Sequence, residues 1–463
     1  MSNRIIRKVK FYKTADYQCQ PAKVRQAAVA GPIQIIDFPQ RVQRLFELGK
    51  KITKFAGCWT ILRVAELHLM RFMRVLTDFE KFRTIDTPFW YYDMDLLRAT
   101  VDKAAALSAK YGIGLHYAIK ANVEPRIVQY ISSKGIGADC VSGNEVVFAA
   151  RNGFRPDTIV YAGVGKTDKE INTALDLGIE AFNCESIMEM QVIDELAARK
   201  GVRARVSVRI NPNIDAHTHR YVTTGLYENK FGISRHEFDA VINLLKNAKA
   251  LDFAGLHFHI GSQITDVEEV YSLECERAAE IVEYFESKGL EVRSIDLGGG
   301  LGVNYDDPDE FPIPDFEAWL GTISAKLRRR PEQKVSVEPG RSLVAQCGSL
   351  ITRVLFVKNG ETKAFLIMDA GMNDLIRPAL YGAYHRIDNL TALSEGREEG
   401  LQQYDVVGPV CESSDVWGAG RDLPYSRRGD IMALRSAGAY GSVMSSRYNL
   451  RDIAPAVFSD DLK

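Results

Sequence analysis

From about Thr87 onward, the sequence alternates short β-branched runs with helical stretches that end on glycine. This alternation is typical of repeated β–α units, which build parallel sheets. Eight parallel strands favour a TIM barrel, an α/β fold, although the same units laid flat would form a doubly wound open sheet. The eight expected strands are LHYAIK (115–120), GIGADCVS (135–142), TIVYAG (158–163), EAFNCES (180–186), RVSVRINP (205–212), GLHFHIGS (255–262), VRSIDLGGG (292–300) and KVSVEPG (334–340).

After about residue 345 the rhythm changes, because strand-like runs such as SLITRVLFVKNG and KAFLIMDAG follow one another without helical spacers. We therefore expect a (β/α)8 barrel over 93–345 and a second, β-rich domain of the β-sandwich or β-barrel type over 346–463. The stretch 70–92, which ends in TPFWYY, is expected to add a strand to this second domain.

The first 69 residues differ from the rest, with thirteen Lys and Arg residues against four Asp and Glu residues. Three interpretations are open: a basic targeting peptide, an added binding segment, or upstream sequence if the true start is Met70 or Met73. The single serine of this segment, Ser2, disfavours a targeting peptide. We favour the third interpretation and expect the segment 1–69 to be poorly ordered.

The overall composition favours a small-molecule partner. The chain has 59 basic and 60 acidic residues and a net charge of -1, so its charge balance attracts neither nucleic acid nor a membrane surface. We find no run of eighteen apolar residues and no secretory signal. The seven cysteines are scattered without a C-x-x-C pair, which predicts a reducing, cytoplasmic location with no structural disulfide and no zinc site.

The stretch HYAIKAN places Lys120 at the end of an apolar strand, and barrel enzymes carry their chemistry at such strand ends. Burying a hydrated ammonium costs several kcal/mol unless the lysine is paired or loses its charge through a lowered pKa or a Schiff base. Lys120 is therefore either a salt-bridged lysine or the attachment point of an aldehyde.

Two further strand ends carry groups that suit a cofactor. The glycines of DLGGGLG have no Cβ and let backbone N–H groups converge on an anion such as phosphate, although a tight turn explains the run equally well. In GLHFHIGS, His257 and His259 share one face of the strand and are expected to point into the barrel. No third ligand at an obvious spacing accompanies them, so we expect no metal site and interpret His257 as an ordinary hydrogen-bonded histidine.

The stretch SVEPGRS places Glu338 at a strand end and Arg341 three residues later. These side chains can pair with each other, or they can hold two ends of a cofactor that needs a carboxylate at one edge and an anion-binding group at the other. A lysine for an aldehyde, an anion-binding loop, a ring-stacking histidine and a carboxylate for a ring nitrogen together describe pyridoxal 5'-phosphate.

The chain resembles the fold-type III pyridoxal-phosphate decarboxylases, and within them the diaminopimelate decarboxylases. The stretches HYAIKAN, GLHFHIGSQ, DLGGGLG, EPGR, RPALYGAYH, CESSD and AGAYG match motifs of this family, in order, across residues 85–445. The resemblance implies that Lys120 carries the cofactor covalently, that His259 stacks on its ring, and that Glu338 keeps the ring nitrogen protonated. It also implies a phosphate site made of Ser262, Gly299, Gly300, Gly340, Arg341 and Tyr440.

The same resemblance implies the substrate, meso-2,6-diaminopimelate, which is converted to L-lysine and carbon dioxide. Arg377 and Tyr381 in RPALY resemble the pair that family members use on the distal carboxylate, because a guanidinium suits a carboxylate and repels the cationic tail of ornithine or arginine. Arg341 and Tyr440 are implied to contact the substrate as well.

In CESSD, the resemblance implies that Cys411 reprotonates the α-carbon and that Glu412 holds the distal amino group. Family members build each site from two subunits, with this loop reaching in from the partner. An obligate homodimer with shared active sites is therefore implied.

Three alternatives stay open from the sequence. An amino-acid racemase shares the lysine-bearing barrel, but it needs a tyrosine as second base and lacks the CESSD and HIGSQ pattern. A decarboxylase for arginine, ornithine or carboxynorspermidine differs only at a few wall residues. A non-catalytic regulatory homologue would have lost the cofactor set, whereas here Lys120, His259, Glu338, Arg341 and Cys411 are all present.

Overall fold

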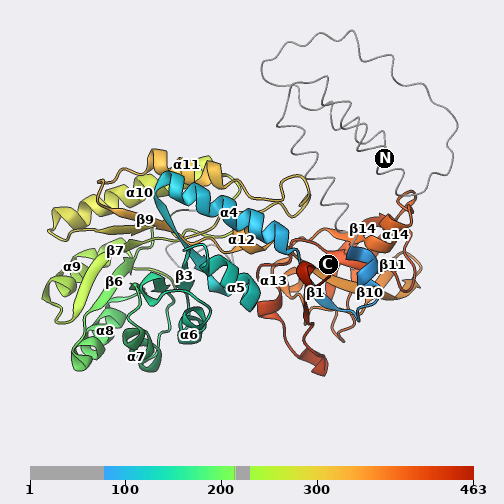
Figure 1. Cartoon of the computed structure of the whole chain (residues 1–463), viewed down its shortest axis with the longest axis horizontal. Helices are drawn as coiled ribbons and strands as arrows, with labels where there is room; N and C mark the ends of the chain where they lie inside the picture. The colour runs from blue at the N-terminus through green and yellow to red at the C-terminus, as the bar shows by residue number, and fades with distance from the viewer. Residues whose placement is uncertain (1–77, 213, 215–229, 463) are drawn as a thin grey trace, which may run out of the picture. The chain divides into compact units, whose positions relative to one another are not determined.

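A computed structural model describes residues 78–212, 214 and 230–462, so the expectations for residues 1–69 lie outside the described part of the chain. Eight parallel strands close into a barrel in the order β2 to β9, with helices around it (Figure 1). The predicted TIM barrel is therefore confirmed, and the open sheet is wrong. The barrel strands are β2 (Ile113–Ala118), β3 (Gly137–Cys140), β4 (Ile159–Tyr161), β5 (Ala181–Cys184), β6 (Ala204–Arg209), β7 (Leu251–His257), β8 (Ser294–Asp296) and β9 (Lys334–Val337).

One helix precedes the barrel, and the connections between successive strands carry the others. They are α4 (Met94–Tyr111), α5 (Pro125–Ser132), α6 (Gly143–Arg151), α7 (Asp168–Leu177), α8 (Ile187–Lys200), α9 (Phe238–Asn247), α10 (Val267–Ser287) and α11 (Phe316–Lys326), with the short α12 (Arg341–Val344) after β9.

Local sequence signals explain where these helices begin and end. The Asp93 side chain caps α4 by accepting hydrogen bonds from the backbone N–H groups of Asp95 and Leu96. Gly112 ends the same helix in the left-handed conformation that glycine tolerates, with φ of 64°. Helix α7 begins with a reciprocal capping box between Thr167 and Glu170.

Each expected barrel strand overlaps one observed strand, but several observed strands end earlier than expected. Lys120 lies in a 3-10 turn, η1 (Ile119–Ala121), just after β2, and His259 and Glu338 follow the ends of β7 and β9. The Tyr117 hydroxyl donates to the carbonyl of Asn122 at 2.9 Å, which fastens the turn that carries Lys120. These three side chains therefore lie on the rim of the barrel, beyond the hydrogen-bonded strands.

The second domain is a β-rich sheet of eight strands with the central order β12-β15-β10-β11-β13-β14. Strand β1, which precedes the barrel in sequence, pairs antiparallel with β10 and parallel with β16. The predicted second β-rich domain is confirmed. Its elements are β1 (Phe89–Tyr92), β10 (Gly348–Asn359), β11 (Ala364–Met368), α13 (Arg377–Tyr381), β12 (Ile387–Asn389), α14 (Leu390–Ser394), β13 (Leu401–Val407), β14 (Val416–Pro424), β15 (Ile431–Leu434) and β16 (Ala456–Phe458).

Two hydrogen bonds tie the segment after β15 to the turn that carries Lys120. The Asn122 amide donates to the carbonyl of Gly438 at 2.8 Å, and the Tyr440 N–H donates to the carbonyl of Ala121 at 2.8 Å. A Cβ on Gly438 would lie 2.0 Å from the Val344 carbonyl oxygen, so only glycine fits this approach. This contact brings Tyr440 beside the barrel rim.

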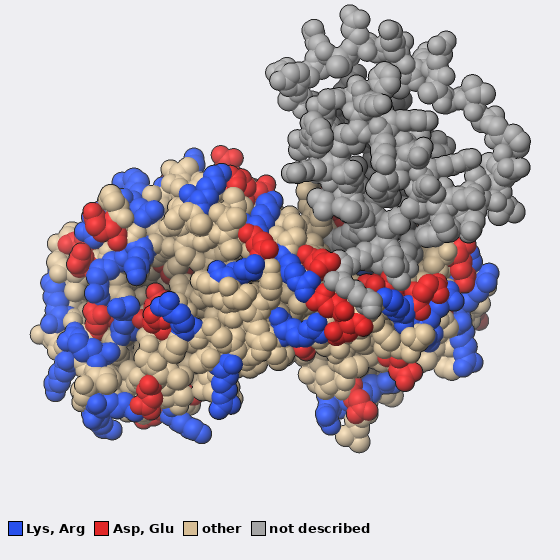
Figure 2. Space-filling model, in the orientation of Figure 1, with Lys and Arg blue, Asp and Glu red and all other residues tan. Residues whose placement is uncertain are grey.

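The surface carries both signs of charge. Figure 2 shows Lys and Arg side chains interspersed with Asp and Glu side chains on the face in view, without one dominant charged patch. Within the described residues, no helix is long and apolar enough to cross a membrane.

Candidate active site

A cavity of about 980 Å³ opens at the rim where the barrel strands end. Its walls come from loops after the barrel strands and from the second domain. Ten of the sequence-predicted site residues line it: Lys120, His259, Ser262, Gly300, Glu338, Gly340, Arg341, Arg377, Tyr381 and Tyr440.

Lys120 makes an ion pair with Asp139, and the two atoms Nζ and Oδ2 are 2.7 Å apart. Asp139 is fully buried on β3, next to β2, while 36% of the Lys120 side chain is exposed to the cavity. Burial alone would lower the pKa of Lys120, but the carboxylates of Asp139 and Glu338 outweigh it and raise the pKa. Asp139 therefore holds the ammonium of Lys120 in place at the cavity edge.

Asp139 was not predicted from the sequence. Its signal was an acid inside the otherwise apolar strand GIGADCVS, where a buried carboxylate requires a partner. Its other oxygen, Oδ1, has no hydrogen-bond partner among the described residues. The ion pair with Lys120 is therefore the main interaction that offsets the cost of burying this carboxylate.

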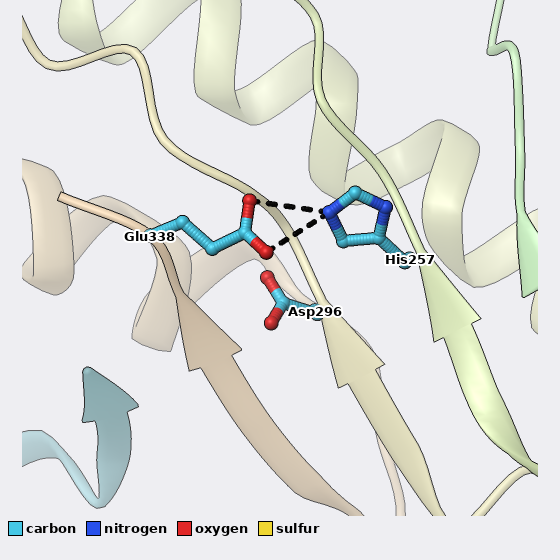
Figure 3. Close-up of side chains that lie close together, drawn as sticks. All are labelled: His257, Asp296 and Glu338. Atoms are coloured by element: carbon cyan, nitrogen blue, oxygen red, sulfur yellow. Dashed lines mark hydrogen bonds and ion pairs between the residues drawn. The ribbon is translucent and has the colours of Figure 1, made fainter. Parts of the chain in front are cut away.

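Glu338 lines the cavity and reaches down to His257 (Figure 3), whose Nε2 lies 3.1 and 3.2 Å from its two carboxylate oxygens. Burial opposes the charge on His257, but Glu338 outweighs it and raises the pKa of this histidine. His257 is thus the hydrogen-bonded core histidine that the sequence predicted, and it orients the carboxylate that faces the cavity.

Asp296 lies beside this pair (Figure 3), and one ligand-type atom from each of His257, Asp296 and Glu338 lies within 4.8 Å of the others. The sequence offered no third ligand for His257 at an obvious spacing, so this grouping was unexpected. Asp296 already accepts hydrogen bonds from the Gly298 N–H and the Ser336 hydroxyl, each at 2.8 Å. Since all three side chains have protein partners, we interpret the group as a buried proton-sharing cluster.

His259 is held as a neutral imidazole. The Gly299 N–H donates to His259 Nδ1 at 3.1 Å, which requires a lone pair on that nitrogen. Burial and the cations of Arg209 and Lys120 lower the pKa of His259 well below its ordinary value. A neutral, flat ring beside Lys120 suits stacking on an aromatic cofactor. Gly299, predicted as a phosphate ligand, here orients His259 and does not itself line the cavity.

The glycine loop packs so closely against neighbouring backbone that it has no space for a side chain. A Cβ on Gly299 would lie 2.3 Å from the Glu338 carbonyl oxygen, and one on Gly300, whose φ is 114°, would lie 2.8 Å from the Gly261 carbonyl oxygen. Gly300 and Arg341 both line the cavity. Arg341 donates to the Ser262 hydroxyl at 3.0 Å, and its guanidinium lies over the Tyr440 ring. Bare backbone, a hydroxyl and a buried guanidinium form a donor set that fits a phosphate group.

Tyr440 adopts a left-handed backbone conformation with φ of 55°. A tyrosine in this conformation is strained, and such strain persists only where the surroundings enforce it, typically at functional sites. Here the hydrogen bond from Tyr440 N–H to Ala121 and the neighbouring Gly438 contact supply that constraint.

Arg377 and Arg341 share one acceptor, the hydroxyl of Tyr305, at 3.0 and 2.6 Å. His385 also accepts from Arg377 at 3.1 Å, while its other ring nitrogen donates to the Arg435 carbonyl. Burial and the Arg377 cation lower the pKa of His385 to about 3, so this histidine is neutral. The pair Tyr305 and His385 therefore fixes a buried guanidinium in the cavity wall without neutralising it.

Tyr305 was missed by the sequence analysis, although it stands only a few residues after the glycine run in DLGGGLGVNY. A tyrosine in a loop carries no pattern of its own. Its importance arises only when two arginines from distant parts of the chain converge on its hydroxyl.

Cys411 and Glu412 do not join this cavity within the described chain. Cys411 is exposed, and its N–H donates to the Asn449 side chain at 3.1 Å. Glu412 is also exposed and accepts from the Ser414 hydroxyl at 2.8 Å. Neither side chain lines the cavity that holds Lys120.

Comparison with known proteins identifies the family. Residues 97–345 match the family described as pyridoxal-dependent decarboxylase, pyridoxal binding domain. A diaminopimelate decarboxylase of Bacteroides thetaiotaomicron is 50% identical over 391 residues, which cover 84% of this chain and 100% of the relative. That of Aquifex aeolicus is 39% identical and covers 82% of this chain and 88% of its own length.

The chain belongs to the diaminopimelate decarboxylase family of pyridoxal-dependent enzymes. The predicted cofactor and the predicted enzyme class, a decarboxylase, are thereby confirmed. A crystal structure of diaminopimelate decarboxylase from Helicobacter pylori complexed with L-lysine has a TM-score of 0.74 and 40% identity, covering 82% of this chain and 93% of that one. An arginine decarboxylase from Paramecium bursaria Chlorella virus has a TM-score of 0.72 but only 20% identity, so it shares the fold alone.

Replacing Asp139 tests the origin of the Lys120 charge. Burial lowers the pKa of Lys120, and Asp139→Asn removes one of the two carboxylates that oppose this effect. The pKa of Lys120 should therefore fall by more than about one unit. Competitive acetylation of the cofactor-free protein across pH, read by mass spectrometry of the Lys120 peptide, measures this value. Asp102→Asn, which removes the surface partner of Lys134, is the matched control and should leave Lys120 unchanged. An unchanged Lys120 titration in Asp139→Asn would contradict this account.

Proposed function

We propose that this chain removes one carboxylate of meso-2,6-diaminopimelate as carbon dioxide and leaves L-lysine, with pyridoxal 5'-phosphate attached to Lys120. The observation that carries the proposal is that Lys120, Glu338 and Arg341 line one cavity together with the buried Arg377, which shares the Tyr305 hydroxyl with Arg341. The relatives at 39–50% identity over most of their lengths support the same activity.

Each wall of the cavity suits one end of the cofactor. The glycine loop, Ser262 and Arg341 would hold the phosphate, and neutral His259 would lie against the ring. Glu338, oriented by His257, would keep the ring nitrogen protonated, because a nearby carboxylate raises the pKa of that nitrogen. When bound, the cofactor supplies an electron sink for the pair left by the departing carboxylate.

Arg377 would select the substrate by its distal carboxylate. Within the described residues, only Nη1 of this guanidinium has hydrogen-bond partners, the Tyr305 hydroxyl and His385. A carboxylate can accept from the remaining donors, whereas the ammonium or guanidinium tail of ornithine or arginine would meet a buried positive charge. Tyr381 and Tyr440 line the same cavity and would border the substrate.

The exposed position of Cys411 supports a homodimer in which each site receives the loop 411–414 of the partner subunit. The two ends of this loop are held by Asp415, whose carboxylate oxygens accept from the backbone N–H groups of Val410 and Met372, each at 2.7 Å. Beside it, Leu450 is 95% exposed, an apolar side chain that a subunit interface would bury. In the dimer, Cys411 would return a proton to the α-carbon and Glu412 would bind the distal amino group.

We also propose a cytoplasmic location. Support comes from the cysteines, since Cys140, Cys184, Cys275 and Cys347 are buried as free thiols, which suits a reducing compartment.

Carbon dioxide release should be measured with meso-diaminopimelate, ornithine, arginine and alanine. We expect release from diaminopimelate, and we expect Arg377→Gln to lower kcat/KM by about 100-fold, chiefly through KM, because a charge-assisted contact to the distal carboxylate is lost. The control Arg386→Gln alters a half-buried arginine that pairs with Asp388 outside the cavity and should retain activity. Release from ornithine or arginine alone would overturn the assigned substrate.

The shared site can be tested by mixing two inactive variants. Lys120→Ala and Cys411→Ala subunits, allowed to exchange, should form hybrid dimers with one intact site and regain about a quarter of the original activity. Lys120→Ala mixed with Glu338→Gln is the control, because both residues come from one subunit and no intact site can form. Subunit exchange without any recovery in the first mixture would show that each site is built within one chain.

A further inference from the structure

The barrel interior below Glu338 is unusual for a TIM barrel. Bulky branched side chains normally fill this space. Here the buried side chains on β2, β8 and β7 include His116, Asp296 and His257. A second cavity of about 390 Å³ at the opposite end of the barrel is lined by His116, Glu180 and Asp296 among others. Titratable groups therefore extend from this second cavity to the active site.

His116 contacts an acid on each side. Its Nε2 lies 3.0 Å from a Glu180 carboxylate oxygen, and its Nδ1 lies 3.8 Å from Asp296 Oδ2. On β3, a Cβ on Gly137 would lie 2.4 Å from the His116 ring, so the strand has glycine where the imidazole needs space. The ring is thus built into the barrel between two carboxylates.

Asp296 connects His116 to the active site. In the sheet register it lies opposite His257 on one side and Ser336 on the other. It belongs to the cluster with His257 and Glu338 whose atoms lie within 4.8 Å of one another (Figure 3). One carboxylate therefore joins the imidazole at the bottom of the barrel to the carboxylate that faces the cavity.

The charges along this path depend on one another. Burial opposes the charge on His116, but Glu180 and Asp296 outweigh it and raise the pKa of His116 to about 9. Burial and the Glu338 carboxylate raise the pKa of Asp296. The groups that face His116 are Glu180, Asp296 and Glu338, and the cations of Lys334 and Arg205 face Glu180.

We propose that His116 is a positioning residue that acts through Asp296 on Glu338 and keeps the ring-nitrogen end of the cofactor site ionised at neutral pH. This inference rests on the proposed function. An imidazolium next to Asp296 favours its carboxylate form, and the pair Asp296 and Glu338 then holds one proton fewer. Without that positive charge Asp296 takes up a proton from solvent at a higher pH, and the ring-nitrogen end of the site loses a negative charge that supports a protonated ring nitrogen.

The test compares His116→Gln, which keeps a polar side chain of similar size, with Glu180→Gln, which removes the acid that sustains the imidazolium. Absorbance of the cofactor-loaded protein is titrated from pH 9 downward. The midpoint of the acid-side spectral change should rise by about one pH unit in His116→Gln and by less in Glu180→Gln, since a unit charge is lost near a buried acid. At pH 7, kcat should fall about tenfold with KM unchanged, because His116 does not touch the substrate.

Glu332→Gln is the matched control, because Glu332 is exposed and lines the same second cavity without contacting His116. It should titrate like the original protein. If His116→Gln fails to fold, Glu180→Gln carries the test alone, since Glu180 lies at the cavity edge. Midpoints in His116→Gln and Glu180→Gln that equal the original would overturn the proposal. A raised KM and weaker cofactor binding without any shift of the midpoint would overturn it as well.

A second readout does not need the cofactor. Nuclear magnetic resonance of ¹⁵N-histidine in the cofactor-free protein should show one imidazole that titrates near pH 9 and disappears in His116→Gln. A pKa of about 6.5 for His116, the ordinary value for a histidine, would overturn the inference even if the enzyme proves active. Conversely, if the loaded protein shows no lysine-bound absorbance, the proposed function fails while this measurement still tests His116.

Discussion

The pairing of β2 with β9 is the constraint on which the active site depends. It closes the barrel, with Leu115 opposite Val337, and so brings the segment after β2 next to the segment after β9. Lys120 and Glu338 then face one cavity. If the eight strands lay flat in sequence order, these side chains would be about 34 Å apart, because neighbouring strands are about 4.8 Å apart. The chemistry of the cofactor therefore requires the closed sheet.

Closure also brings charged side chains together inside the barrel, and several of them lie in ion pairs. Lys120 pairs with Asp139, Glu338 with His257, and Arg209 with Glu185. Removing one partner of a buried ion pair lowers the free energy of unfolding by about 3–5 kcal/mol, because the other charge is left buried without a partner. Such pairs therefore stabilise the barrel only when both members are present. The cations of Arg209 and Lys120 help to keep His259 neutral, and the carboxylates of Glu180 and Asp296 raise the pKa of His116.

The sequence was sufficient to predict the barrel, because β–α alternation is a local pattern, and to predict Lys120, His259 and Glu338 as cavity residues, because polar side chains at strand ends converge in any barrel. It did not predict the ends of the strands, which depend on rim contacts such as the one between Tyr117 and Asn122. Asp139, Tyr305 and His116 were missed for a related reason. Their roles come from partners 19 to 180 positions away, such as Lys120 for Asp139 and Asp296 for His116, and no local pattern reports such pairs. The roles assigned to Cys411 and Glu412 stay predictions, since these side chains lie outside the cavity that holds Lys120.

The central claim is that Lys120 is the point of cofactor attachment. Borohydride reduction of the protein loaded with pyridoxal 5'-phosphate, followed by mass spectrometry of its peptides, tests it directly. The account predicts one pyridoxyl group per chain, on Lys120, and none on Lys166, a buried lysine that is already paired with Glu189 and two carbonyl oxygens. A pyridoxyl group on Lys166 or any other lysine, with Lys120 unmodified, would contradict it.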